Sequence, residues 1–547
     1  MKRFAISLFP LVITSYVYAT PLPYPSYTSA TGIPANQQIP MEALWLHLTA
    51  AQMGGVTIPK SFDASSYWPY MVENNLDYQT YRQSYDNGTC NVPADNSNNA
   101  TIERAMQSQG LDIYDGAVWQ IALALAAKNN PIQYTQDVEG YKNFLINGLN
   151  SGFQSYHAFT NYHYNGKLIP SEKNSYFLKF ISPSWAFNYD SINDCNMQWP
   201  EWSAVTGEEA WAVLLGPVQS IYLLNDGANN PNWSSSSEAG DYIQLGKNAL
   251  GAIQQMQAPS GGVYRNVTQP GQAQDFNISL ENNFSLYAGL SILEQALKDR
   301  DSTATMHQAK FQRLLHSDQD DINTIDNIKK GLIQFFAGLG GVTVFNKDGN
   351  YFYSSVNGAT PDTADFAVDV QTWGATIIAT DPILLQAMTS AYGPDVMYNM
   401  FEAAINKSAY LDSSNNLLGV GYTAQQPSDN FYVLSGEWTL GAINAAIVLA
   451  DYYKNDAVKS TLLISQVKQM LAGVTAEASS LQGDATSPTA RISYLYANKR
   501  VLIPFGWYSN KMPATSATGW SLMVNSCFDP FELGGGNHQP ICQQLKL

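Results

Sequence analysis

Charged residues are scarce in this sequence, and basic ones are the scarcest. Only 13% of the 547 residues are charged, and 28 Lys and Arg stand against 45 Asp and Glu, a formal net charge of −17. Nucleic acids bind basic surfaces because their phosphates must be neutralised, so this balance excludes nucleic acid as the main partner. The same surplus of acids disfavours anionic membranes and anionic polymers.

Long apolar runs and metal-binding motifs are also missing. After the N-terminus no segment approaches the roughly 20 apolar residues that a transmembrane helix needs, so we expect no membrane partner. The chain has six histidines, which show no ligand spacing, and no CxxC motif. We therefore expect neither a metal nor a cofactor.

The N-terminus reads as a secretory signal. Residues 1–19, "MKRFAISLFPLVITSYVYA", combine a basic start, an apolar middle and a small residue, Ala19, at the end. This pattern predicts cleavage near Ala19 and export to the extracellular space or the periplasm. The four cysteines are an even number, which in an exported chain is compatible with disulfides. We favour pairing of Cys527 with Cys542, because only a short Gly-rich loop separates them.

Hydrophobic residues make up 45% of the chain and aromatic ones 12%, enough for a large core and for a cleft lined with rings. One kind of segment recurs six times: a polar or acidic head, an aromatic residue soon after it, and a small-residue apolar helix. The segments begin at Asp112, Gly207, Leu280, Asp369, Ser435 and Thr518, and their aromatic residues are Trp119, Trp211, Phe284, Trp373, Trp438 and Trp520.

Amphipathic helices of another kind lie between these segments. Apolar residues recur in them at spacings of three and four, with polar residues on the other side, as on a helix with one wet face. The predicted ranges are 137–152, 241–256, 322–340, 396–411 and 461–474, with 97–109 or 41–53 as a further N-terminal candidate.

Helices that are apolar all round belong inside a domain, whereas amphipathic ones belong outside. The alternation therefore predicts an all-α fold, an (α/α)6 toroid of six inner and six outer helices. Gly- and aromatic-rich stretches precede the inner helices, so we expect short β-hairpins or loops at the mouth where those helices begin. We divide the chain into a signal peptide (1–19), a partly irregular extension that packs on the toroid (20–95) and the toroidal domain (96–547).

Carboxylates gather at the same mouth in this arrangement. The candidates at the heads of the first five inner helices are Asp115, Glu208, Glu281, Asp369 and Glu437. Hydrolysis of a glycosidic bond commonly needs two carboxyl groups, one protonated and one ionised. An acid in the first turn of a helix also caps amide groups and complements the dipole, so each residue has a purely structural explanation as well.

Aromatic side chains require the same distinction between core and site. The helical tryptophans are expected to be core wedges, because large rings are usually buried. Rings in the loops are the better candidates for stacking on sugars, and we assign Trp202, Tyr264, Tyr422 and Trp507 to substrate binding, together with Asp115 and Glu208.

The chain resembles the six-hairpin glycosidase superfamily, which includes glucoamylases and several cellulases. The resemblance rests on the alternation of helices and on the phrases "SLENNFSLYAGL", "DVQTWG", "SGEWTLGA" and "SATGWSLMVNSCFDPFELGG". It implies a site at the mouth and, in many members, an inverting mechanism with the carboxyl groups about 6.5–9.5 Å apart. No close match to the catalytic motifs of a particular family is present.

The leading hypothesis is a secreted, monomeric glycoside hydrolase that acts on a neutral oligo- or polysaccharide, with a glucan favoured. We assign Glu281 as general acid and Glu437 or Asp369 as base. Two alternatives remain open: a polysaccharide lyase on the same toroid, and a non-catalytic carbohydrate-binding surface protein.

Overall fold

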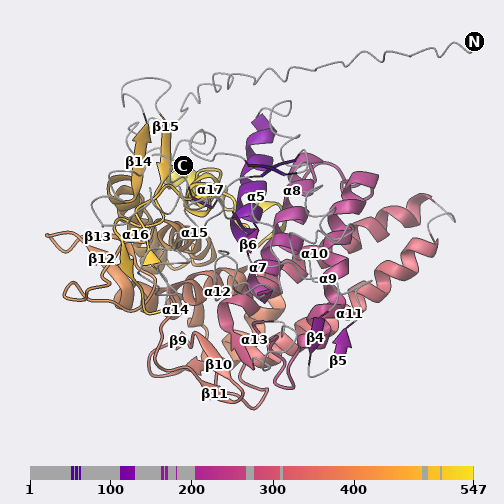
Figure 1. Cartoon of the computed structure of the whole chain (residues 1–547), viewed down its shortest axis with the longest axis horizontal. Coiled ribbons are helices and arrows are strands. Elements are labelled where there is room, and N and C mark those ends of the chain that lie inside the picture. The colour runs from indigo at the N-terminus through magenta and orange to yellow at the C-terminus, as the bar shows by residue number, and fades with distance from the viewer. Residues whose placement is uncertain are drawn as a thin grey trace, which may run out of the picture.

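Helices dominate the computed structural model (Figure 1). It describes residues 51–53, 56–58, 61–62, 111–129, 162–164, 167–169, 180–181, 204–266, 276–307, 312–482, 491–505 and 508–545. Each of the six recurring segments is helical, as predicted. These helices are α5 (Ile113–Asn129), the run α7–η4–α8 (Thr206–Leu224), α10 (Leu280–His307), α12 (Val368–Thr380), α15 (Gly436–Tyr452) and α17 (Thr515–Asn525).

These six helices form a closed ring. Each packs on the next in chain order, and the last, α17, packs on both α15 and α5. Their side chains are buried on nearly every side: in α15 every residue from Gly436 to Ala450 is buried. A helix without a wet face has no stable position except inside other helices. The chain is therefore an (α/α)6 toroid, and the predicted fold class is confirmed.

The second inner helix contains a π-helical stretch, η4 (Ala210–Leu215), between α7 (Thr206–Glu209) and α8 (Gly216–Leu224). Pro217 follows two residues after the end of this stretch. A proline in a regular α-helix cannot donate a hydrogen bond to the carbonyl group four residues earlier, here that of Val213. The proline ring also clashes with that carbonyl group. The wider π turn accommodates the ring, and it places Trp211 on the inner side of the toroid.

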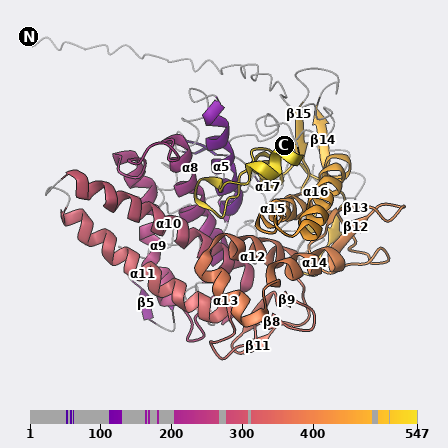
Figure 2. The same cartoon turned by 180° about the vertical axis from the view of Figure 1, so that it is seen from behind.

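The outer helices predicted at 241–256, 322–340, 396–411 and 461–474 are also present. They are α9 (Ser237–Met256), α11 (Gln312–Phe336), α14 (Val396–Ser408) and α16 (Ala457–Glu477). Two shorter helices, α13 (Pro382–Tyr392) and α18 (Gln539–Leu545), pack beside them. In both views α11 and α16 lie on opposite sides of the molecule with α5, α12 and α17 between them (Figures 1 and 2).

Short strands precede the inner helices along the chain. The strand β7 (Asn277–Ser279) leads directly into α10 and pairs with β10 (Ser355–Asn357), which pairs in turn with β11 (Thr360–Pro361). Five hairpins are β8–β9 (Phe345–Asn346, Tyr351–Phe352), β12–β13 (Ala409–Leu411, Leu417–Val420), β14–β15 (Ser479–Gln482, Arg491–Tyr494), β16–β17 (Val501–Leu502, Tyr508–Ser509) and β4–β5 (Tyr162–Tyr164, Lys167–Ile169). The strand β3 (Leu111–Asp112) pairs with β6 (Phe180–Ile181) before α5, and β1 (Ala51–Met53) pairs with β2 (Val56–Ile58).

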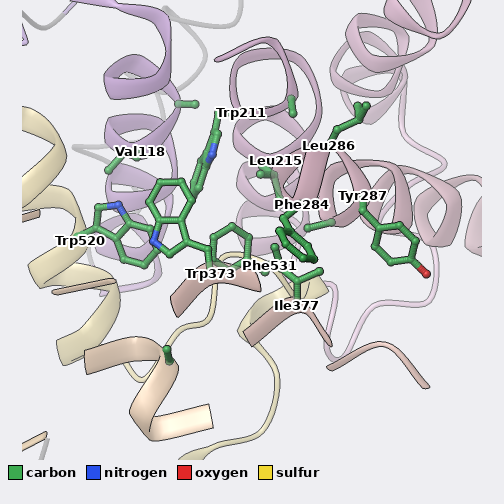
Figure 3. Close-up of a cluster of buried hydrophobic side chains, with 14 of the residues drawn as sticks. Val118, Trp211, Leu215, Phe284, Leu286, Tyr287, Trp373, Ile377, Trp520 and Phe531 are labelled. Carbon is green, nitrogen blue, oxygen red and sulfur yellow. The ribbon is translucent and has the colours of Figure 1, made fainter. Parts of the chain in front are cut away.

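An aromatic cluster closes the axis of the ring. Trp211, Trp373, Trp520 and Phe531 converge from four parts of the chain, and their ring centroids lie 5.5–6.1 Å apart (Figure 3). All four side chains are buried. Trp211, Trp373 and Trp520 are thus core residues, as expected of tryptophans on inner helices, and together with Phe531 they form a floor across the toroid.

Several sequence predictions concern residues near the termini. A disulfide joins Cys527 and Cys542, as predicted, with their Cα atoms 6.1 Å apart. In the described part of the chain no helix is both long and apolar enough to cross a membrane. Residues 1–19, Cys90, Cys195 and the helices expected at 97–109 and 137–152 lie outside the described residues. Of the alternative helix at 41–53, the described residues Ala51–Met53 form the strand β1 instead.

Candidate active site

A cavity of about 410 Å³ opens at the end of the toroid where the inner helices begin. This volume falls within the usual range for small-molecule sites. Every inner helix contributes a lining residue from its first turns or from the loop before it, and Trp211 and Trp373 of the aromatic cluster form the base. The N-terminal residue Phe62 also borders the cavity, next to Tyr496, with the two ring centroids 5.3 Å apart.

The five acids singled out in the sequence all line this one cavity. They are Asp115 on α5, Glu208 on α7, Glu281 on α10, Asp369 on α12 and Glu437 on α15. Glu209, the neighbour of Glu208, is buried and does not line it. The ring of inner helices therefore brings together carboxyl groups that are 322 residues apart at the extremes of the sequence, from 115 to 437.

Capping of helix α15 does not explain the position of Glu437 at the start of that helix. The side chain that caps α15 is that of Ser435, whose hydroxyl accepts a 3.1 Å hydrogen bond from the amide of Trp438. Glu437 itself is 5% exposed and borders the cavity. A buried acid that is not needed for the helix end is a candidate for function, because its desolvation must be compensated.

Asp369 is a buried acid with two acidic neighbours. Burial, followed by the nearby charges of Glu281 and Glu437, holds the pKa of Asp369 well above its ordinary value. Backbone hydrogen bonds oppose this effect, and the larger contribution comes from the amide of Val370, which donates to Oδ1 at 2.7 Å. The helix α12 lies between α10 and α15 in the ring, so Asp369 has one acidic neighbour on each side. Two like charges at close range favour protonation of one of the groups.

Glu281 is held by two donors from its own helix. Nδ2 of Asn282 lies 2.6 Å from Oε2, and the hydroxyl of Ser285 lies 2.8 Å from Oε1. The indole of Trp211 donates in turn to the hydroxyl of Ser285 at 3.2 Å. Donors on both oxygens stabilise an ionised carboxylate and fix its orientation.

Glu437 accepts a hydrogen bond from a residue on the other side of the ring. The hydroxyl of Tyr114 donates to Oε1 of Glu437 at 2.7 Å, and the indole of Trp520 donates to the Tyr114 oxygen, also at 2.7 Å. Burial, together with the charge of Glu437, raises the pKa of Tyr114 well above 10. The phenol therefore keeps its proton and acts as a donor to the carboxylate.

The charge of the cavity is strongly negative. Eight of the described residues that line it are acidic, and a single basic one, Arg265, is among them; no described lining residue is a histidine. A cavity of this charge repels anionic ligands and admits neutral ones. The acids are Asp112, Asp115, Glu208, Glu281, Asp362, Asp365, Asp369 and Glu437.

Two of the four aromatic residues assigned to substrate binding lie elsewhere. Tyr264 is 9% exposed, packs on Phe276 and does not line the cavity. Its neighbour Arg265 does, because successive side chains of an extended segment point to opposite sides. Tyr422 is 1% exposed and packs behind Trp438, with its hydroxyl bonded to a backbone carbonyl. Trp202 and Trp507 lie outside the described residues.

The aromatic wall consists instead of residues that the sequence did not single out for binding. Trp438, Tyr496 and Phe505 line the cavity beside Glu437. Trp438 carried a usable signal, because a side chain in the first turn of an inner helix lies at the mouth as well as in the core. Tyr114 carried another, since it stands between two acids in "DIYD". Tyr496 and Phe505 come from a long connection, and nothing local marks them.

Known proteins resemble this chain in structure rather than in sequence. No protein-family model matches it, and no curated protein matches it in sequence. Among solved structures, a D-mannose isomerase covers 85% of this chain and 98% of its own length at 11% identity, with a TM-score of 0.46. A GH76 α-mannanase of Bacteroides thetaiotaomicron covers 83% and 98% at 11% identity, with a TM-score of 0.43.

An unsaturated glucuronyl hydrolase from Bacillus sp. GL1 covers 76% of this chain and 85% of its own length at 8% identity, with a TM-score of 0.46. These neighbours are six-hairpin glycosidase-like enzymes, and they include both hydrolases and sugar isomerases. At such identities and TM-scores, activity, substrate and site residues must be argued from the residues of this chain.

Proposed function

We propose that this protein is a glycoside hydrolase that acts on a neutral oligo- or polysaccharide, with a glucan as the favoured substrate. The observation that carries the proposal is the environment of Asp369, a buried carboxyl group whose pKa is raised by burial and by two flanking acids. Both effects favour the protonated form of the carboxyl group, which is the form that a general acid needs.

The contacts of the three carboxyl groups favour an assignment that differs from the one based on sequence. Asp369 is the general acid, and it protonates the oxygen of the leaving sugar. Glu437 is the base that receives a proton from water, oriented by Tyr114. Glu281, held by Asn282 and Ser285, supplies the fixed negative charge that keeps the proton on Asp369.

The remaining lining residues suit a sugar. Trp438, Tyr496 and Phe505 offer ring faces for the apolar faces of pyranoses, while Asp115 and Glu208 accept hydrogen bonds from hydroxyl groups. The excess of acids opposes the binding of uronates, which are the substrates of polysaccharide lyases. A hydrolase of neutral sugars is therefore favoured over a lyase.

The decisive experiment compares two substrates that differ in their leaving group. After a screen for released reducing sugars has identified a substrate, Asp369→Asn should lower kcat on it by about 10²–10⁴-fold. The same variant should retain far more activity on the 2,4-dinitrophenyl glycoside, whose leaving group needs no protonation. Glu437→Gln should be impaired on both substrates. Asp348→Asn, which changes an exposed acid that does not line the cavity, should be impaired on neither.

Three outcomes would overturn the proposal. If Asp369→Asn kept wild-type activity on the identified substrate, Asp369 would not be the general acid. Interconversion of a free sugar without bond cleavage, visible by proton NMR, would make the protein an isomerase or epimerase. Saccharide binding with no released reducing ends after long incubation would make it a binding protein.

A further inference from the structure

The C-terminal segment after α17 folds against the other end of the toroid. The disulfide Cys527–Cys542 closes it, and a short 3-10 turn, η5 (Leu533–Gly535), reverses the chain before α18. The segment lies on the second half of α15, where Asn444 and Asp451 contact it. It contains the motif "GGGNH" (534–538), to which the proposed function gives no role.

Three potential metal ligands converge within this segment. One ligand atom from each of Asp529, Glu532 and His538 lies within 4.8 Å of the other two. Nε2 of His538 is 3.8 Å from Oε2 of Glu532. A tetrahedral zinc ion with bonds of about 2.0–2.2 Å holds its ligand atoms about 3.3 Å apart, so modest side-chain rotations would close the set around an ion.

Two of these ligand atoms are buried without a hydrogen bond. Oδ2 of Asp529 and Nε2 of His538 have no hydrogen-bond partner in the described part of the chain, although the side chains are only 1% and 7% exposed. Such polar atoms destabilise a fold, because they lose their hydrogen bonds with water and gain none in return. Because both residues belong to the cluster of three potential ligands, these unsatisfied atoms indicate that a polar partner belongs there.

The atoms on the opposite side of both ligands are held by outer partners. Oδ1 of Asp529 accepts hydrogen bonds from Nδ2 of Asn444 at 3.0 Å and from the amide of Phe531 at 3.2 Å. Nδ1 of His538 lies 3.3 Å from Oδ2 of Asp451. A carboxylate behind the imidazole and donors behind the carboxylate are the outer contacts that orient ligands in metal sites.

The glycines of the motif provide the space. Gly536 has a φ of 67°, in the left-handed region. A Cβ atom there would lie 2.6 Å from Oε2 of Glu532 and 2.7 Å from Nε2 of His538, against two of the three ligand atoms. Glycine at this position therefore meets both the backbone requirement and the need for room at the point where the ligands meet.

We propose that Asp529, Glu532 and His538 bind a divalent transition-metal ion, Zn²⁺, through two carboxylate oxygens and one imidazole nitrogen. Calcium and magnesium prefer all-oxygen sets, whereas an imidazole with carboxylates suits zinc. Glu532 also borders a second cavity, of about 530 Å³.

The ion would join the C-terminal segment to the ring. Phe531 lies between two of the ligands in sequence and packs on Trp211 and Trp373, the base of the candidate active site. The zinc site is thus a structural one at the far side of the aromatic cluster, and it is independent of the proposed catalytic chemistry.

The test uses the full mature chain, without a histidine tag and with its disulfide intact. After saturation with ZnCl2 and exhaustive dialysis, elemental analysis should find one zinc per chain. Zinc at 100 times its Kd should raise Tm by about 2–3 °C in a protein of this size, and CaCl2 should not. Glu532→Gln, at a partly exposed side chain that tolerates change, should bind zinc at least 10-fold more weakly. Glu477→Gln, at an exposed position of α16, is the matched control.

His538→Gln and Asp529→Asn should also abolish retention of zinc, and their folding can be checked by circular dichroism. Three results would overturn the proposal: no zinc retained by the wild type, equal affinity in Glu532→Gln, or an equal response to calcium. If the wild type retains no zinc, the cluster is a metal-free arrangement of His538 with Asp529 and Glu532.

Discussion

The hydroxyl of Tyr114 donates a 2.7 Å hydrogen bond to Oε1 of Glu437, although 323 residues separate them in the sequence. The two residues belong to the first and fifth inner helices, and the indole of Trp520, on the sixth, completes the chain of donors. The indole of Trp520 and the neutral phenol of Tyr114 thus connect the aromatic cluster to Glu437, the proposed catalytic base.

Tyr114→Phe should lower kcat by about 10-fold with little change in KM, because Glu437 loses a hydrogen bond made to its charged form. The Trp520 indole also loses its acceptor, which should lower the free energy of unfolding by about 1–3 kcal/mol. Steady-state kinetics and urea denaturation measure the two effects. Tyr410→Phe, a partly exposed ring outside the cavity, should change neither. An unchanged kcat in Tyr114→Phe would show that the Tyr114 hydroxyl has no role in catalysis.

The pH dependence of activity tests the role of Glu281. If Asp369 acts as an acid, activity is lost as the pH rises through its raised pKa. Glu281→Gln removes a nearby negative charge that favours the protonated form, so the pKa of Asp369 should fall and the alkaline limb of kcat should move to lower pH. Asp348→Asn should leave the profile unchanged. A shift to higher pH, or none, would contradict the proposed division of roles.

The stability of an Asp369 variant should depend on pH in a defined direction. Burial raises the pKa of Asp369 above its unfolded value of 3.8, so the folded state binds this proton more tightly than the unfolded chain does. The carboxyl group therefore destabilises the fold progressively as the pH rises above about 4 and up to the folded pKa.

Asp369→Asn removes this penalty. Its Tm should be close to that of the wild type near pH 4 and higher at pH 7, where each kcal/mol corresponds to about 1 °C in a chain of this size. Differential scanning calorimetry at both pH values gives the comparison. A Tm at pH 7 below that of the wild type would show that the carboxylate stabilises the protein instead.

Close packing between inner helices can be tested at Gly441, with Gly240 of an outer helix for comparison. A Cβ atom on Gly441 of α15 would lie 2.6 Å from Nε1 of Trp373, whereas one on Gly240 of α9 would meet nothing within 4 Å. Gly441→Ala should therefore destabilise the protein by about 1–3 kcal/mol and disturb the base of the cavity. Gly240→Ala should stabilise it by about 0.5–1 kcal/mol, because alanine is the better helix former. Urea denaturation followed by tryptophan fluorescence measures both.

Export remains a prediction of the sequence. We expect cleavage of the signal near Ala19, so intact mass and N-terminal sequencing of protein recovered outside the cytoplasm should give a chain that begins close to Thr20. An uncleaved N-terminus on the exported protein would refute the processing step.

The helices of this toroid could be predicted because each carries its own signal. A segment such as Ser435–Asp451 is apolar on all sides and starts at a serine cap, so burial and boundary both follow from local residues. The closing of the ring followed from their alternation with amphipathic partners. The gathering of the five acids at one mouth followed in turn, since each stands in the first turn of an inner helix.

Only the tertiary structure decided what these acids contact. Whether Glu281 or Asp369 keeps a proton depends on burial and on neighbouring charges from other helices. The residues next to each acid in the sequence reveal neither of these. Three further features depend on the tertiary structure alone. Tyr114 donates to Glu437, and Tyr264 and Tyr422 lie outside the cavity. His538 lies close to Asp529 and Glu532. Local pattern fixes the hydrophobic faces and the turns of helices, while hydrogen bonds and electrostatic interactions depend on distances of a few ångströms between segments far apart in the chain.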